Sequence, residues 1–129
     1  MQDGLLIVSE DRECRNQMAR MFTDAGYKVT VSSSIASTLC NILKKTVQVV
    51  VLGSHFEEIS AGEIIPLLKR CNKKLRIILM SPETPIGLLR KLRCEGIFYH
   101  ALKPVDATGR EEIRQAVNCA FKNLDMNPV

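Results

Sequence analysis

The sequence lacks the features that mark several large classes of protein. It contains no tryptophan, and aromatic residues make up only 5% of the chain. No apolar stretch approaches the ~20 residues that a membrane-spanning helix needs, and residues 1–4 lack the basic start of a signal peptide. We therefore expect a cytoplasmic protein that does not contact a membrane.

The cysteines are spaced too far apart for a metal site or a disulfide framework. They are an odd number, and no Cys-x-x-Cys pair occurs. The five are Cys14, Cys40, Cys71, Cys94 and Cys119. Each predicted helix carries one of them, and a free cysteine behaves as a small hydrophobic residue, so we expect them in the core or at helix edges.

A strong charge of either sign is also absent. The formal net charge of +4 comes mostly from two groups of basic residues near predicted helix ends, where cations complement the helix macrodipole. The first group is Lys69, Arg70, Lys73, Lys74 and Arg76, and the second is Arg90, Lys91 and Arg93. Nucleic-acid-binding domains usually combine a larger basic excess with aromatic residues, so we expect no direct contact with nucleic acid.

The size and composition of the chain are those of one ordinary globular domain. Its 129 residues suit a single hydrophobic core, and the apolar fraction of 46% and charged fraction of 25% match globular usage. We assign residues 1–124 to this domain. Residues 125–129 form a tail or the start of a linker.

Five segments have the pattern of buried or half-buried strands. Residues 47–52 and 75–80 are near-continuous apolar runs, as in parallel strands that are covered on both faces. The other three segments are residues 5–8, 27–32 and 97–102. Polar or turn-forming residues follow each segment, which indicates that each strand runs into a loop.

A helix pattern follows each predicted strand. Asp11 is a candidate N-cap for the first helix, and Ser33 or Ser34 for the second. Thr84 and Pro85 can begin the fourth helix, because proline is favoured at the first helical position.

The third and fifth helices have a stronger start signal. Residues 60–63 and 108–111 have the form of capping boxes, in which a hydroxyl and a carboxylate satisfy free backbone N–H groups. The apolar residues with helical spacing are Cys14, Met18, Met21, Phe22 and Ala25; Ile35, Leu39, Ile42 and Leu43; Ile64, Leu67, Leu68 and Cys71; Leu88, Leu89 and Leu92; and Ile113, Val117, Ala120, Phe121 and Leu124. In the third and fifth helices we expect them to face the core, with a local kink at Pro66.

Alternating strands and helices predict an α/β fold. Five strands joined by right-handed crossovers through five helices form a doubly wound (βα)5 three-layer sandwich with a five-stranded parallel sheet. Pattern alone does not determine the strand order, and we expect the flavodoxin-like order 2-1-3-4-5, one of two common solutions. In such a sheet, the residues just past the carboxyl ends of the strands form the crevice where ligands bind.

The residues at these strand ends are Ser9 and Glu10 after the first strand, Gly53 after the third, Ser81 after the fourth, and Lys103 with Pro104 after the fifth. The set resembles the receiver domain of two-component response regulators, the CheY-like family, over residues 4–122. That family places an acidic pair, a phosphoacceptor aspartate, a threonine or serine, and Lys-Pro at these four places. The serine and the Lys-Pro match, whereas the aspartate is missing.

Two further expectations come from the resemblance. His100, next to Tyr99, falls where family members carry an aromatic side chain that switches rotamer. The Lys-Pro peptide bond of the family is commonly cis, which implies the same for Lys103 and Pro104.

Gly53 removes the chemistry that the family performs at this edge. Forming an acyl phosphate needs a carboxylate nucleophile and a hard divalent ion held by oxygen ligands. Gly53 supplies neither and Ser9 replaces one acid, so the residual metal candidates are Glu10 and Asp11, of which Asp11 is better placed to cap a helix. We therefore expect no metal, no cofactor and no enzymatic activity, and interpret the chain as a degenerate pseudo-receiver.

Lys103 and Ser81 would remain at a site without its central ligand. A lysine at the low-dielectric end of a sheet needs a partner, and the nearest predicted carboxylate is Glu10. Lys103 is therefore expected either to pair with Glu10 or to bind a small anion together with Ser81 and loop N–H groups.

Two functions fit this pattern. The first is a signal-transduction module of a two-component or phosphorelay system that binds a signalling partner, a histidine kinase or an output domain, independently of phosphorylation. The resemblance implies a docking face on the fourth helix, fifth strand and fifth helix, with the candidates Arg90, Lys91, Arg93, Tyr99, His100, Arg110 and Arg114. The second is a small-molecule or anion sensor, or a divergent phosphoacceptor, that uses the strand-end crevice. Both leave the oligomeric state open.

Overall fold

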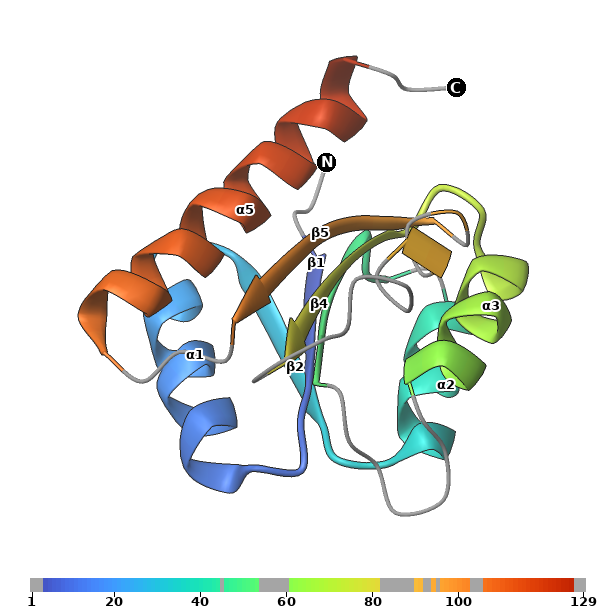
Figure 1. Cartoon of the computed structure of the whole chain (residues 1–129). Coiled ribbons are helices and arrows are strands. Elements are labelled where there is room, and N and C mark those ends of the chain that lie inside the picture. The colour runs from blue at the N-terminus through green and yellow to red at the C-terminus, as the bar shows by residue number, and fades with distance from the viewer. Residues whose placement is uncertain are drawn as a thin grey trace.

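A five-stranded parallel sheet lies at the centre of the structure, which is a computed structural model (Figure 1). It describes residues 4–44, 46–53, 61–81, 90, 91, 94, 96–102 and 106–126. The strands are β1 (Gly4–Val8), β2 (Lys28–Ser32), β3 (Val49–Gly53), β4 (Arg76–Ser81) and β5 (Ile97–Leu102). Their order is β2-β1-β3-β4-β5, and all neighbouring pairs are parallel. The predicted fold class and strand order are confirmed.

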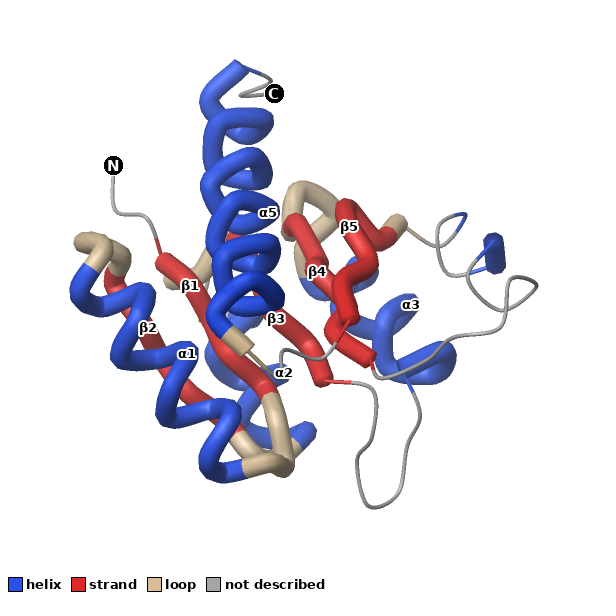
Figure 2. The backbone as a smooth tube through the Cα atoms, turned by 60° about the vertical axis from the view of Figure 1, so that its left-hand side comes forward, coloured by secondary structure: helices blue, strands red, loops and turns tan. Residues whose placement is uncertain are grey.

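Helices cover both faces of the sheet, as Figure 1 and Figure 2 show. The helices α1 (Arg12–Asp24) and α5 (Ala107–Met126) lie on one face, and α2 (Ile35–Leu43) and α3 (Ala61–Cys71) lie on the other. The fourth predicted helix falls mainly outside the described residues. None of the described helices is long and apolar enough to cross a membrane.

The sheet separates two hydrophobic clusters, which explains why its central strands are apolar along their whole length. Side chains alternate along a strand, so Leu5 and Ile7 of β1 join the cluster under α1 and α5. Leu6 and Val8 join the cluster under α2 and α3. Every residue of β1 and β3 is buried, whereas the edge strand β2 is partly open to solvent.

Asp11 begins α1, as the sequence predicts. Its Oδ1 atom accepts a hydrogen bond of 3.2 Å from the Cys14 N–H group, which satisfies one of the free donors at the helix start. Cys14, Met18 and Phe22 recur every four residues and are buried against the sheet. After the last turn, Gly26 adopts a φ of 97°, a left-handed conformation that favours glycine and ends the helix.

Ser34, rather than Ser33, caps α2. Its Oγ accepts a hydrogen bond of 3.2 Å from the Ser37 N–H group. Thr38 is fully buried, and its hydroxyl donates to the Ser34 carbonyl oxygen at 2.8 Å. At the other end of the helix Leu43 is 62% exposed, so its helical spacing does not correspond to a place in the core.

The core-facing side of α3 differs from the prediction at Leu67. Ile64 and Leu68 are buried as predicted, but Leu67 is 40% exposed and Ile65 is buried instead. The segment IIPLL is apolar throughout, so its pattern does not distinguish the two sides of the helix. Packing against the sheet decides between them. Pro66 lies inside α3, as expected.

The basic residues at the end of α3 hold the turn into β4. The Lys69 ammonium donates to the carbonyl oxygens of Lys73 and Leu75 at 2.8 and 2.9 Å. The Arg76 guanidinium donates to the Lys74 carbonyl oxygen at 2.9 Å. Burial, and then the neighbouring Arg76 charge, lower the pKa of Lys69. These contacts agree with a structural role for cations at a helix end.

The five cysteines are all free thiols, but they are not all in the core. Cys14 is buried and Cys71 is half-buried, which fits the expected core or helix-edge positions. Cys40, Cys94 and Cys119 are exposed, so burial in the core does not explain them.

The start of α5 differs from the capping box predicted at residues 108–111. The helix begins at Ala107, and the Asp106 Oδ1 atom accepts a hydrogen bond of 2.9 Å from the Gly109 N–H group. Glu111 binds a side chain one turn later instead of completing a box. Aspartate is a better N-cap than threonine, which explains the earlier start. The predicted inward residues are confirmed, with Ile113, Val117, Ala120 and Phe121 buried and Leu124 packed against them.

The two candidate caps of α5 can be separated by mutation. Asp106→Ala should lower the free energy of unfolding by about 1 kcal/mol, because the Gly109 N–H group would lose its acceptor. Thr108→Ala, the matched control, should change it by less than about 0.5 kcal/mol. Urea denaturation of both variants and the wild type measures the difference. A larger loss of unfolding free energy for Thr108→Ala than for Asp106→Ala would mean that Thr108 caps the helix, as in the predicted capping box.

Candidate functional site

The carboxyl ends of the strands meet at one edge of the sheet, at the bottom of Figure 1. At this edge β1 and β3 are neighbours, with Val8 opposite Leu52. A Cβ atom placed on Gly53 would lie 3.3 Å from the Val8 carbonyl oxygen and 3.7 Å from the Ser9 hydroxyl oxygen. The structure therefore brings Ser9 and Gly53 together, and a Cβ atom at position 53 would be in close contact with the Val8 carbonyl oxygen.

Ser9 holds the loop between β1 and α1. It is buried, and its N–H group donates to the Ser32 carbonyl oxygen of β2 at 3.2 Å. Its hydroxyl oxygen accepts from the Asp11 N–H group at 3.2 Å, and its carbonyl oxygen accepts from an Arg15 Nη1 group at 2.7 Å. Receivers carry an acidic residue at this position. This chain carries a serine there, and its hydroxyl is hydrogen-bonded within its own loop.

The two residual metal candidates lie beside this loop. Glu10 is exposed to solvent, and one carboxylate oxygen of Asp11 caps α1. Within the described parts of the chain, no group of three histidine, cysteine, aspartate or glutamate residues could hold a metal ion. Mg²⁺ is usually held by one or two carboxylates together with waters and substrate phosphates, and one oxygen of Asp11 is already used to cap α1.

Ser81 and His100 form a hydrogen bond that sequence analysis misses. Ser81 is the last residue of β4 and is only 2% exposed. Its Oγ lies 2.7 Å from Nε2 of His100 on β5. A hydroxyl can donate or accept, so it can pair with this ring nitrogen in either tautomer. The receiver resemblance assigns Ser81 to the place of the family's threonine or serine, and His100 to the place of the aromatic side chain that switches rotamer. The hydrogen bond therefore joins these two places.

An irregular pairing of β4 with β5 makes this contact possible. The register shifts by one residue near the start of β5, which leaves Phe98 as an extra residue. The shift places His100 opposite Leu79, on the face of the sheet that also holds Ser81. Without it, His100 would lie opposite Met80 and point to the other face. A pattern of residues within β5 contains no signal for this shift.

The docking face is described in part. Arg90 and Lys91 are exposed, and Tyr99 is 40% exposed, so these three side chains are open to contact. His100 is half-buried and bound to Ser81, so it presents less surface.

Three predicted site residues lie outside the described part of the chain. They are Arg93, Lys103 and Pro104. The pairing of Lys103 with Glu10 or an anion, and the cis peptide bond, therefore stay predictions.

Arg114, another docking candidate, is engaged on its own helix. Its Nε donates to Glu111 Oε2 at 2.8 Å, and its Nη2 group binds the other carboxylate oxygen. This pairing lowers the pKa of Glu111 and raises that of Arg114. Arg114 therefore offers a partner less free charge than its sequence suggests, whereas Arg110 makes no ion pair with the described residues.

Comparisons with known proteins identify the fold. No protein-family model and no curated protein matches this chain. The signal receiver domain of an HD domain-containing protein from Pseudomonas fluorescens Pf-5 is 16% identical, with 98% of this chain and 99% of that chain covered and a TM-score of 0.86. A response regulator receiver domain protein from Clostridium thermocellum is 17% identical, covered at 96% and 98%, with a TM-score of 0.85.

A third structure is a response regulator protein from Burkholderia pseudomallei with a phosphorylated aspartic acid. It is 16% identical, with 98% of this chain and 73% of that chain covered and a TM-score of 0.79. Together these structures show that the chain has the CheY-like fold of response regulator receiver domains.

Proposed function

We propose that this chain is a receiver-like signal-transduction domain that does not form an acyl phosphate. The observation that carries the proposal is Gly53, which ends β3 beside Ser9 at the strand-end edge. Glycine has no side chain that could accept a phosphoryl group or ligate a metal ion. The fold is that of a receiver, but its central chemical group is absent from the sequence.

The surrounding polar groups support the same function. Phosphoryl transfer to a carboxylate needs a divalent ion that neutralises the transferring oxygens. Ser9 and Asp11 serve the start of α1, and Glu10 is exposed beside them. We therefore propose a degenerate pseudo-receiver with no catalytic turnover, no metal and no cofactor.

Signalling without phosphorylation would operate through protein binding in the cytoplasm. The similar structures are named as response regulators and signal receiver domains, which supports a signalling protein, a histidine kinase or an output domain, as the partner. Arg90, Lys91 and Tyr99 are exposed on the proposed docking face. Arginine and tyrosine are enriched among residues that dominate binding energy at interfaces.

A second candidate function is ligand sensing at the strand-end edge. The proximity of Ser81 and His100 favours it, because a hydroxyl and an imidazole can bind small anions and polar ligands, and a ligand would take the place of their mutual hydrogen bond. A ligand would then replace the phosphoryl group as the signal. The docking variants described in the Discussion distinguish the two functions.

Treatment with acetyl phosphate and Mg²⁺ should leave the intact mass of the protein unchanged. Gly53 has no carboxylate that could attack the phosphoryl donor, so no acyl phosphate can form at the end of β3. Intact-protein mass spectrometry at neutral pH measures this directly, with an aspartate-containing receiver domain as the positive control. An increase of about 80 Da that hydroxylamine removes would contradict the proposal.

Gly53→Asp is the matched variant for the same experiment. The new carboxylate should bind Mg²⁺ weakly, since Ser9 still leaves the site short of one acid. The variant should also be less stable than the wild type, because its Cβ would lie 3.3 Å from the Val8 carbonyl oxygen. Phosphorylation of the wild type, without phosphorylation of this variant, would mean that another residue accepts the phosphoryl group. The proposal that Gly53 prevents phosphorylation would then be wrong.

A further inference from the structure

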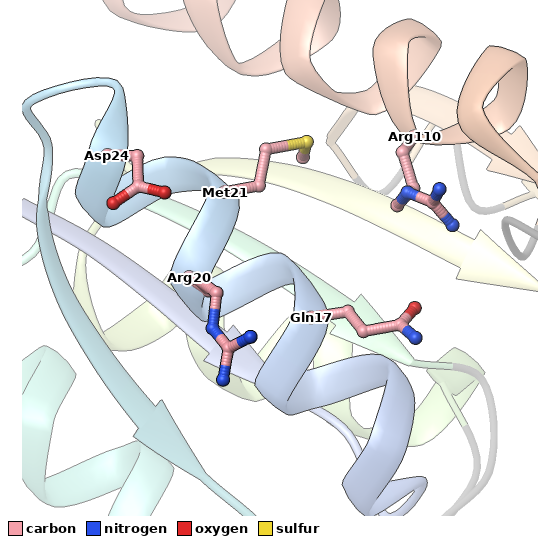
Figure 3. Close-up of a pocket in the computed structure, with 5 residues that line it drawn as sticks. All are labelled: Gln17, Arg20, Met21, Asp24 and Arg110. Atoms are coloured by element: carbon pink, nitrogen blue, oxygen red, sulfur yellow. The ribbon is translucent and has the colours of Figure 1, made fainter.

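A groove of about 340 Å³ lies between α1 and the first turns of α5, and it shares Arg110 with the docking face that the receiver resemblance implies. Gln17, Arg20, Met21 and Asp24 line it from α1, and Arg110 lines it from α5 (Figure 3). Arg20 and Met21 are adjacent, and each lies three or four positions from Gln17 and Asp24, so the four α1 residues form one side of the helix.

The two arginines of the groove form no ion pair within the part of the chain that the structure describes. Neither the Arg20 nor the Arg110 guanidinium makes an ion pair or hydrogen bond with the described residues. Arg114, one turn further along α5, is by contrast paired with Glu111. A guanidinium group presents several hydrogen-bond donors in a planar fork.

The remaining groups add specificity to this charge. Figure 3 shows Met21 between Asp24 and Arg110, with the Asp24 carboxylate at the opposite end of the row from Arg110. Met21 is half-buried and offers a soft apolar contact, and the Gln17 amide can both donate and accept. Arg20 precedes Asp24 by four residues on α1, so Asp24 partly offsets the charge of Arg20, and the groove is most positive at Arg110.

We infer that this groove docks an acidic peptide segment of a partner protein, with glutamate or aspartate side chains bound to Arg20 and Arg110. The guanidinium fork matches the two oxygens of a carboxylate. Gln17, Arg20 and Asp24 are exposed and none of the five lining residues is buried, so the groove suits an extended chain better than an enclosed small molecule.

A second copy of this chain is a poorer occupant than an acidic partner. Each copy carries a net charge of +4, so two copies repel at long range, whereas an acidic segment is attracted. The inference concerns α1 and the start of α5, and it does not depend on Arg90, Lys91 or Tyr99, the exposed docking candidates near the fourth helix and on β5.

The experiment measures binding of a fluorescein-labelled peptide of six glutamates by fluorescence anisotropy, at about 50 mM salt so that exposed charges are weakly screened. Arg20→Gln and Arg110→Gln should each weaken binding about two- to fivefold, and together about tenfold, since exposed ion pairs are individually weak. Asp24→Asn should tighten binding about twofold because it removes a repulsive carboxylate. Far-UV circular dichroism checks that each variant is folded.

The matched control is the pair Arg70→Gln and Lys74→Gln. It removes the same charge from exposed residues at the end of α3. We expect it to weaken binding less than twofold at this salt concentration. Equal losses for the control pair and the groove pair would overturn the inference, because binding would then follow net charge alone.

Two other results would also overturn it. The first is no binding of the glutamate peptide to the wild type at about 1 mM, an affinity below that of useful docking contacts. The second is a dimer in sedimentation velocity that Arg20→Gln and Arg110→Gln disperse, which would assign the groove to a second copy of the chain.

Discussion

Replacement of Phe22 by alanine should lower the free energy of unfolding by about 3–5 kcal/mol, a large part of the stability of a domain of this size. Phe22 is fully buried in the cluster under α1 and α5. Its ring meets Tyr27 edge-on at a centroid distance of 5.7 Å, and Tyr27 stacks on Phe121 at 5.2 Å. Alanine would leave a cavity and remove the first of these aromatic contacts.

Urea denaturation measures this loss, and Leu43→Ala is the control. Leu43 is a large apolar residue of α2 but is 62% exposed, so its truncation should cost less than about 0.5 kcal/mol. Similar losses for the two variants would mean that α1 does not pack on the sheet as described.

The second large effect is expected at the docking face. A variant that combines Arg90→Glu, Lys91→Glu and Tyr99→Ala should weaken capture of the signalling partner about 100-fold. The tyrosine would lose an exposed aromatic contact, and the reversed charges would repel a partner that is complementary to the wild type. Quantitative pull-down from the source cells, with tagged wild type and variant, measures the loss.

Stability should not account for that loss. Each change is at an exposed position, so each should alter the free energy of unfolding by no more than about 0.5 kcal/mol. Glu10→Gln removes a carboxylate at the strand-end edge, and Ser81→Ala removes the hydroxyl bound to His100. Loss of capture in these two variants, with full capture by the triple variant, would favour the ligand-sensing function.

The meeting of Ser9 and Gly53 follows from topology, so it can be predicted once the expected strand order is assumed. All carboxyl ends of a parallel sheet lie at one edge, and the order 2-1-3-4-5 makes the first and third strands neighbours. Residues directly after those strands must then come together. The buried character of β1 and β3 can also be predicted, since their apolar runs are continuous.

Local signals are less decisive where two of them compete. Asp106 and Thr108 are both acceptable caps, and the observed hydrogen bond to Gly109 selects the first. Ile65 and Leu67 are both apolar, and only contact with the sheet shows that Ile65 is the buried one. The stronger local N-cap decides the first case, and packing against the sheet decides the second.

By itself, the sequence determined the alternation of strands and helices and the absence of an acceptor side chain at Gly53. Both are properties of residue identity and short-range periodicity, which distant contacts do not alter. Only the tertiary structure decided the shifted register of β5 that joins His100 to Ser81, and the approach of Arg110 to the exposed side of α1. Register and helix approach depend on packing between segments far apart in the chain, and no local pattern contains the sum of those contacts.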